Sequence, residues 1–138
     1  MRYGRVGIDL VPFGRVREMV GRDNGAALAR MLSEEETRLS RTAGGPDIAG
    51  IAGRLAAKEA VFKLFRVPGQ TLPWLGIEIL KDDGGWPVVR LGGRAADLAR
   101  DAGLEHIEVS ITHDEPCAVA VAFCAGAPEA DTSRLTSA

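Results

Sequence analysis

The sequence predicts an α+β domain in which an antiparallel sheet packs against a long central helix. Near the N-terminus, over residues 5–11, apolar residues alternate with other residues, as they do along a strand with one buried face. Two later pairs of strand-like segments enclose short turns, which predicts two antiparallel hairpins. Residues 54–65, before these hairpins, are apolar nearly all round a helical wheel, which is typical of a buried helix. The order strand, helices, hairpin, helix, hairpin is that of the α+β class.

The N-terminal strand holds the first candidate site residue. In "RVGIDLV", residues 5–11, Asp9 falls on the less apolar face of the predicted strand, and Pro12 ends that strand. A helix is expected next, from about Gly14 to Val20. A single aspartate on a strand is more often a surface or turn-directed residue than a ligand. Asp9 therefore becomes a site candidate only if other polar groups meet it.

Two further helices are predicted before the first hairpin. "LSEEETRL" opens a helix whose N-terminus can be closed by a capping box between Ser33 and Glu36. The loop "TAGGPD" then leads into the long central helix, and Pro46 fits the first turn of that helix. Because apolar side chains cover most of its surface, the central helix is expected to be buried.

The second half of the chain consists of two predicted hairpins and a short helix. Residues 74–80 and 87–91 are predicted strands joined through "KDDGG". A helix over about 94–102 separates them from a second pair of strands, 106–113 and 117–125, which turn at "DEP". Strands that pair locally in this way form antiparallel sheets.

The cysteines and the C-terminal residues complete the description of the domain. Cys117 and Cys124 lie seven positions apart in one predicted strand, so they point to opposite faces and cannot form a disulfide with each other there. We expect both to be small buried apolar residues. We predict one domain over residues 1–125 and a disordered tail over residues 126–138, "GAPEADTSRLTSA", which is small and polar.

Length, composition and charge exclude several classes of protein. With 138 residues, of which 46% are hydrophobic and 26% charged, the chain is sufficient for one globular domain with a core. A formal net charge of −2 and seven aromatic residues argue against a nucleic-acid-binding protein. No apolar run approaches the roughly 18 residues of a membrane span, and "MRYGRVGIDL" lacks the apolar core of a signal peptide. We therefore expect a cytoplasmic protein without a membrane partner.

Four charged side chains interrupt the apolar surface of the central helix in "RLAAKEAVFKLF", residues 54–65. At about 100° per residue, Arg54 and Lys58 share one stripe, and Glu59 and Lys63 share a second stripe about 140° away. At least one stripe should be partly desolvated, because a helix this apolar is normally buried. Glu59 and Lys63 could form a solvated i, i+4 pair worth about 0.3 kcal/mol, or the charged wall of a crevice. Lysine is rare in this arginine-rich chain, which favours the crevice.

Carboxylates and basic groups on separate elements could meet at one site. Asp9 lies on the first strand, Glu59 and Lys63 on the central helix, and His113 at the end of a later strand. Two carboxylates from different elements are a minimal Mg²⁺ site, because Mg²⁺ also takes waters and substrate phosphates as ligands. Basic side chains nearby would then hold phosphate, a combination that fits phosphoryl transfer. A lone histidine at a strand end is otherwise usually solvated.

The motifs that carry these residues resemble those of a known family. "GIDL", "GRLAAKEAVFK", "IEILKDDGGWP" and "VSITH" followed by "AVAVAF" are similar, in this order, to motifs of the holo-acyl-carrier-protein synthases. These are the short type of the 4'-phosphopantetheinyl transferase superfamily. The resemblance spans about residues 3–124 and implies the 4'-phosphopantetheinyl transferase fold. Cys117, at a position where the family usually has an aromatic residue, and Trp86 depart from the pattern, and neither touches the proposed metal chemistry.

The resemblance implies an enzyme with two substrates. It would transfer the 4'-phosphopantetheine arm of coenzyme A to a serine of an apo acyl carrier protein and release adenosine 3',5'-bisphosphate. The carrier could serve fatty acid, polyketide or other biosynthesis, and Mg²⁺ would be the cofactor. The alternative is a non-catalytic module that binds coenzyme A or a carrier protein. Loss of a metal carboxylate would be expected in such a relative, whereas Asp9 and Glu59 are both present.

The resemblance also implies roles for the charged residues of the central site. Asp9 and Glu59 match the family's magnesium ligands, and the metal would bridge them to the pyrophosphate of coenzyme A. Lys63 matches the lysine beside that pyrophosphate. The acceptor serine could lose its proton to Glu59, to Lys63 or to a water bound to the metal, and the sequence does not choose among them. Lys58 receives no role.

Five more residues match positions that bind coenzyme A in the family. Arg54 and His113 would hold the 3'-phosphate, with Thr112 close by. Gly85 and Pro87 match the turn that passes the nucleotide. A site for coenzyme A is therefore expected to draw on the central helix, the first hairpin and the second hairpin.

Two expectations concern protein partners. Arg15 and Arg22 lie seven positions apart, on one helical face if the first helix extends that far, and the family match makes them candidates to dock an acidic carrier protein. A solvated face is their simpler interpretation. The resemblance further implies a homotrimer with an active site at each subunit boundary. The apolar run 117–125 is compatible with this, although burial within one protomer would also explain it.

Overall fold

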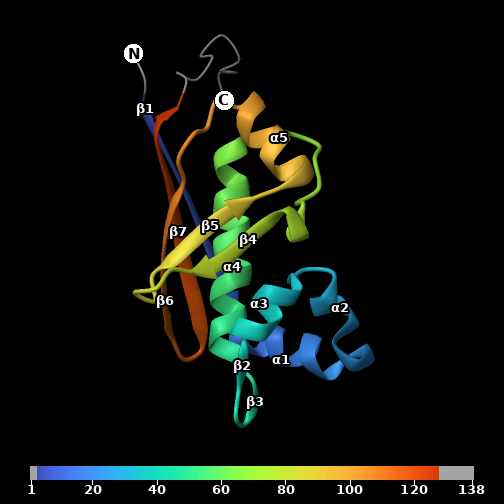
Figure 1. Cartoon of the computed structure of the whole chain (residues 1–138). Coiled ribbons are helices and arrows are strands. Elements are labelled where there is room, and N and C mark those ends of the chain that lie inside the picture. Colours follow the sequence, from blue (N-terminus) through green and yellow to red (C-terminus); the bar gives the residue numbers. More distant parts are fainter. Residues whose placement is uncertain (1–2, 128–138) are drawn as a thin grey trace, which may run out of the picture.

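A central helix lies between a three-stranded antiparallel sheet and a layer made of a hairpin and shorter helices (Figure 1). The computed structural model describes residues 3–127 of the chain. The sheet has the strand order β1-β7-β6, formed by β1 (Tyr3–Pro12), β6 (Glu108–Asp114) and β7 (Cys117–Ala127). The central helix is α4 (Ile48–Phe65). The predicted α+β class, with an antiparallel sheet against a long helix, is confirmed.

Shorter elements surround this centre. Strands β4 (Ile77–Lys81) and β5 (Pro87–Leu91) pair as one hairpin, and β2 (Arg41–Thr42) and β3 (Gly45–Pro46) pair as another. The remaining helices are α1 (Phe13–Gly21), α2 (Ala26–Ala29), α3 (Glu34–Leu39) and α5 (Gly93–Asp101), with 3-10 turns η1 (Asp23–Gly25) and η2 (Trp74–Gly76). Within residues 3–127, none of the helices has the length and apolar character that a membrane span requires.

Helix α4 forms the centre of the core, and Asp47 caps its N-terminus. The Asp47 side chain accepts a hydrogen bond from the Gly50 backbone N–H at 3.0 Å, which satisfies a donor at the helix start. Small side chains on α4 let β1 approach very closely. A Cβ atom placed on Gly7 of β1 would lie 2.1 Å from the carbonyl oxygen of Ala60. The distance between β1 and α4 is therefore fixed by backbone contact.

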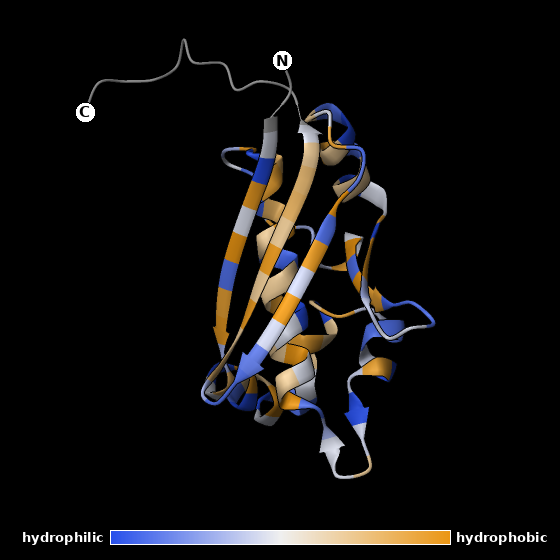
Figure 2. Cartoon of the chain, turned by 90° about the vertical axis from the view of Figure 1, so that its left-hand side faces the viewer, coloured by the Kyte–Doolittle hydropathy of each residue, from blue (hydrophilic) through white to orange (hydrophobic). Residues whose placement is uncertain are grey.

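The two faces of the sheet differ in what covers them. Asp9 pairs with Ala120, which pairs with Ile111, so these side chains share the face toward α4. Alternate residues of β7 on that face are fully buried: Ala118, Ala120, Ala122 and Cys124. The opposite face carries large apolar side chains that are 36–64% exposed: Val6, Ile8, Leu10, Val121 and Phe123. Figure 2 looks onto this face, where hydrophobic and more hydrophilic residues alternate along β1 and β6, whereas β7 between them is hydrophobic along most of its length.

Several predicted boundaries need correction. Pro46 ends β3 and precedes the helix cap Asp47, so it does not lie in the first turn of α4. Residues 74–76 form a 3-10 turn instead of the start of a strand. Strand β7 reaches residue 127, two residues beyond the predicted domain end, and the rest of the predicted tail lies outside the described residues.

The predicted thiol environments are confirmed in part. Both cysteines are free, and Cys124 is fully buried, whereas Cys117 is only half-buried. Cys117 pairs with Pro12 at the end of the sheet, where less of the chain covers it. The expectation of a small buried residue therefore holds for Cys124 alone.

Candidate active site

Asp9, Glu59 and Lys63 meet where β1 passes over α4. The Lys63 Nζ atom donates a hydrogen bond to the Ile8 carbonyl oxygen at 2.6 Å and lies 3.5 Å from Asp9 Oδ1. The Lys63 side chain is 54% exposed, whereas that of Asp9 is 19% exposed. Its ammonium group is thus fixed by backbone at the edge of the site, with part of its surface open to a ligand.

The pKa of Glu59 is raised to about 7. Burial is the largest cause, because it disfavours the charged carboxylate, and hydrogen bonding and charge repulsion from Asp9 act in the same direction. The positive charges of Arg15 and Lys63 act in the opposite direction. A carboxylate pair with a shift of this size is typical of functional sites, although structural networks also produce such shifts.

The donor set of this site fits Mg²⁺. Among residues 3–127, Asp9 Oδ2 is buried without a hydrogen-bond donor when both carboxyl groups are ionised, which is a costly arrangement for a carboxylate oxygen. Residues 3–127 contain no group of three or more His, Cys, Asp and Glu side chains that could hold a metal. Asp9 and Glu59 offer two carboxylates, and water and substrate oxygens would complete the shell, as Mg²⁺ prefers.

Arg15, predicted only as a residue that docks the carrier protein, also acts on this site. Its charge acts on Glu59, and its side chain is exposed on α1. Arg22 follows the last helical residue, Gly21, and has extended backbone angles (φ −98°, ψ 137°). The common face of Arg15 and Arg22 was expected only if the first helix extended to residue 22, and this condition is not met. Both are exposed, and their role in docking a carrier protein stays a prediction.

Arg54 lies inside the protomer, on the far side of α4 from Glu59. It is 5% exposed, and its Nε donates to the Ile79 carbonyl oxygen at 3.0 Å. Its Nη1 donates to Ser40 Oγ at 3.2 Å. These bonds use two of the five guanidinium N–H groups, so one N–H on Nη1 and both on Nη2 stay available, and the expected contact with the 3'-phosphate of coenzyme A stays a prediction.

The other residues predicted to bind coenzyme A lie on the two hairpins. Gly85, with φ of 85°, and Pro87 follow the end of β4, and the left-handed backbone at residue 85 favours glycine. Thr112 and His113 are exposed on the edge strand β6, where the His113 ring lies 6.3 Å from the Phe13 ring of α1. In the described chain, no hydrogen bond or ion pair joins these four residues to the carboxylates of the central site.

A buried ion pair between α3 and α4 was not predicted from the sequence. The side chains of Lys58 and Glu36 are both 0% exposed, and Lys58 Nζ lies 2.6 Å from Glu36 Oε1. The capping box of Ser33 and Glu36 is confirmed, yet the same carboxylate also binds Lys58. The fully desolvated stripe of α4 is therefore the one formed by Arg54 and Lys58. At least one charged stripe of α4 was expected to be partly desolvated, and the stripe of Arg54 and Lys58 is the more buried of the two.

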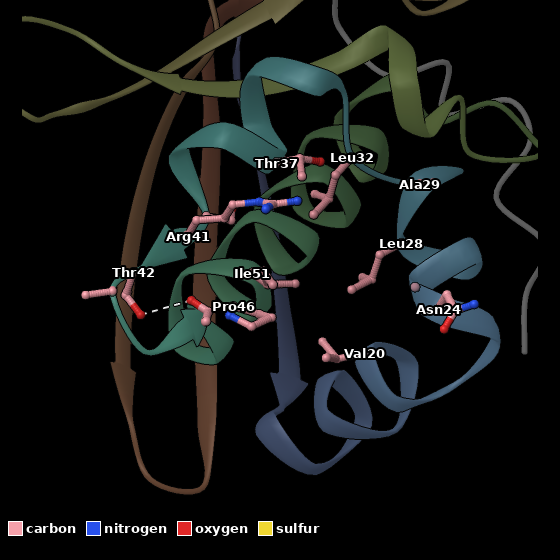
Figure 3. A pocket seen from close by; sticks show the side chains of 14 residues that line it. Val20, Asn24, Leu28, Ala29, Leu32, Thr37, Arg41, Thr42, Pro46 and Ile51 are labelled. Atoms are coloured by element: carbon pink, nitrogen blue, oxygen red, sulfur yellow. Dashed lines mark hydrogen bonds between the residues drawn. The ribbon is translucent and has the colours of Figure 1, made fainter.

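A cavity of about 560 Å³ lies between α1, α2 and the segment from α3 to β3 (Figure 3). Its lining includes the apolar side chains of Val20, Leu28 and Ile51 and the polar side chains of Arg41 and Thr42. None of the predicted site residues lines it. The cavity is therefore separate from the site formed by Asp9, Glu59 and Lys63.

Comparison with known proteins connects this geometry to a family. The family model described as the 4'-phosphopantetheinyl transferase superfamily, ACPS, matches residues 5–124. The chain belongs to this superfamily. It is 34% identical over 118 residues to a holo-[acyl-carrier-protein] synthase of Natranaerobius thermophilus, a match that covers 86% of this chain and 94% of the relative.

Solved structures of the superfamily share the fold. An ACPS-CoA complex from Chronobacterium ammoniagenes is 30% identical, with a TM-score of 0.75, over 88% of this chain and 96% of the other. The Helicobacter pylori holo-[acyl-carrier-protein] synthase in complex with coenzyme A is also 30% identical, with a TM-score of 0.74, over 87% of this chain and 99% of the other. The predicted superfamily fold is confirmed.

Proposed function

We propose that this chain transfers the 4'-phosphopantetheine arm of coenzyme A to a serine of an apo acyl carrier protein, as a holo-acyl-carrier-protein synthase. The observation that carries the proposal is the meeting of Asp9, Glu59 and Lys63 on β1 and α4. Relatives in this superfamily are named for this reaction and are solved with coenzyme A, and a non-catalytic binding module would have no need of a half-buried pair of carboxylates. The enzyme is therefore the favoured interpretation.

The side chains of the site have complementary roles in this reaction. Asp9 and Glu59 would hold Mg²⁺, which when bound supplies positive charge to the phosphoryl oxygens. Lys63, fixed by the Ile8 carbonyl, adds a second positive charge where the pyrophosphate would lie. The serine oxygen bonds to the phosphorus that carries the pantetheine arm, and the bond from that phosphorus to the nucleotide phosphate oxygen breaks. The serine proton passes to a base, for which Glu59 and Lys63 are the nearby side chains.

We also propose that the active form is a homotrimer in which a neighbour completes each site. The open face of the sheet, with Ile8, Leu10 and Phe123 each more than 40% exposed, offers an apolar surface of the kind that subunits cover. Within residues 3–127 of one protomer, no hydrogen bond or ion pair joins the hairpin residues expected to bind coenzyme A to Asp9 or Glu59, which a shared site would explain. Light scattering should give about three times 14.6 kDa, and a fully active monomer would contradict the shared site.

The reaction is tested by incubating the protein with coenzyme A, Mg²⁺ and an apo carrier protein, followed by intact mass measurement of the carrier. We expect the carrier to gain one phosphopantetheine arm, and the gain to disappear when EDTA replaces Mg²⁺. Carriers from fatty acid and polyketide synthesis should be compared, because the site does not distinguish them. No gain on any carrier would favour the non-catalytic binding module. That the reaction takes place in the cytoplasm remains a prediction.

A further inference from the structure

The buried Lys58–Glu36 ion pair is the polar feature of α4 that the proposed reaction does not use. Lys58 Nζ donates to Glu36 Oε1 at 2.6 Å and to the Trp74 carbonyl oxygen at 2.7 Å. The Glu36 carboxylate also accepts hydrogen bonds from the backbone N–H groups of Ser33 at 3.1 Å and Ile79 at 3.0 Å. One pair of side chains thus connects α3, α4, η2 and β4.

Stability alone does not account for this pair. Taking two charges out of water is expensive, and replacing a buried ion pair by apolar residues of similar volume is often neutral or stabilising. The pair adds a directional constraint, because its hydrogen bonds keep good geometry in only one arrangement of the four elements. Buried polar groups can in this way specify one geometry at a cost in stability.

The surface of α4 makes such a directional contact necessary. Many of its buried positions are small: Ala52, Gly53, Ala56, Ala57 and Ala60. Helices interlock through ridges of side chains, and a row of alanines offers shallow ridges, so packing alone resists rotation and sliding of α4 weakly. Glu59 follows Lys58 directly, and a rotation of the helix would carry its carboxylate away from Asp9.

We propose that Lys58 and Glu36 are positioning residues that fix the rotation and axial position of α4 and thereby aim Glu59 at Asp9. This rests on the proposed function only in taking Asp9 and Glu59 as the metal ligands. The contact with Trp74 also anchors the chain that leaves α4. The helix is thus held on either side of Glu59, by the ion pair at residue 58 and by the contact of β1 with Ala60.

The test uses the neutral double variant Glu36→Gln/Lys58→Met. Glu36→Gln keeps an acceptor oxygen for the capping contacts at this position, and Lys58→Met keeps most of the length of the lysine side chain without its charge, so neither buried charge is left unpaired. The matched control is Asp97→Asn/Arg100→Met, which removes an exposed ion pair of α5 by the same chemistry. The urea unfolding midpoint of Glu36→Gln/Lys58→Met should fall, because the Trp74 carbonyl loses its donor and the single amide oxygen can replace only one of the two carboxylate oxygens. The midpoint of the control should stay within about 0.5 M of wild type, and the comparisons are made under conditions in which both double variants are folded.

Positioning predicts a loss at the metal site that a purely structural role would not produce. Binding of Mn²⁺ alone, followed by electron paramagnetic resonance, should weaken about tenfold or more in Glu36→Gln/Lys58→Met and stay unchanged in the control. In the transfer assay, kcat should fall about tenfold or more, while KM for coenzyme A changes less than about threefold. A folded double variant with Mn²⁺ affinity and kcat within about twofold of wild type would overturn the proposal.

Two further comparisons keep the test decisive. If the double variant does not fold, Lys58→Met alone breaks the ion pair while the Glu36 carboxylate keeps the backbone N–H groups of Ser33 and Ile79 and the nearby charge of Arg54. Unchanged Mn²⁺ affinity in this variant would equally overturn the proposal. If the wild-type protein modifies no carrier, the proposed function fails. The Mn²⁺ comparison still tests positioning in that case, because it needs neither coenzyme A nor a carrier.

Discussion

Replacing Gly7 by alanine should disrupt the contact that sets the distance between β1 and α4. The added Cβ would lie 2.1 Å from the Ala60 carbonyl oxygen, 3.0 Å from the Ala60 carbonyl carbon and 3.2 Å from Lys63 Cβ. Ordinary carbon–oxygen contacts are about 3.3 Å or longer, so strand and helix would have to separate by about 1 Å. Backbone blocks the methyl group here, so no rotamer change can relieve the clash.

The cost follows from this geometry. Overpacking of a core costs about 1–3 kcal/mol when side chains can adjust, so we expect Gly7→Ala to lose about 3 kcal/mol or more of the free energy of unfolding. Total stability of a domain is about 5–15 kcal/mol, so the variant would be marginal. Asp9 lies two residues along the same face of β1, and the same displacement would move its carboxylate away from Glu59. Transfer activity should therefore fall even in the fraction that stays folded.

Two alanine variants calibrate the measurement, which is urea unfolding followed by circular dichroism. Gly53→Ala meets only the Ile111 Cγ2 atom, at 2.8 Å, and also gains up to about 1 kcal/mol of helix propensity, so its net loss should be clearly smaller. Gly14→Ala meets nothing within 4 Å in α1 and should be neutral or stabilising by up to about 1 kcal/mol. A Gly7→Ala protein within about 0.5 kcal/mol of wild type would refute the reasoning.

Four other outcomes are expected. Glu59→Gln should abolish turnover while its urea midpoint stays at or above that of metal-free wild type, and near-normal turnover at saturating Mg²⁺ would exclude the role of Glu59 as a ligand. Because the pKa of Glu59 is raised to about 7 in the folded state, its contribution to stability is present below about pH 4.5 and is lost as the pH rises through about 7. At pH 8, metal-free wild type should therefore unfold at a lower urea concentration than Glu59→Gln. Added Mg²⁺ should reduce this difference between the two midpoints. Phe123→Asp should lower the mass found by light scattering, and an unchanged mass would exclude the open sheet face as an interface. Arg54→Ala should lower the free energy of unfolding by about 1–3 kcal/mol, because the Ile79 carbonyl loses its hydrogen-bond donor. A variant of unchanged stability, altered only in KM for coenzyme A, would contradict a structural role for Arg54.

Local sequence signals predicted most of the elements. Each of these signals depends on neighbours within a few positions: the alternation of apolar residues in β1, the turn residues of the two hairpins, and the capping box of Ser33 and Glu36. The structure contains all of the elements that they predicted. The pairing of Glu59 and Lys63 with Asp9 also needed the family motifs, because no periodic pattern indicates which strand crosses α4 at that point.

Contacts between distant positions could not be predicted in this way. Glu36 and Lys58 are 22 positions apart, and each had a sufficient local explanation, as a capping residue and as part of a charged stripe. Arg54 was expected to meet a phosphate, whereas two of its nitrogens bind Ile79 and Ser40. In both cases, burial on the packed side of α4 decides the partner, and that side depends on the tertiary arrangement.

The adjacency of Lys58 and Glu59 also limits how the chain can change its length. One residue inserted between them would turn everything after it by about 100° and advance it by about 1.5 Å, so the ion pair and the carboxylate pair could not both be kept. The connection over residues 66–73 joins α4 to η2 outside regular structure, and extra residues there would leave both sides of the helix unchanged. Insertions and deletions, whether natural or engineered, should therefore accumulate in that connection and be absent between Arg54 and Lys63.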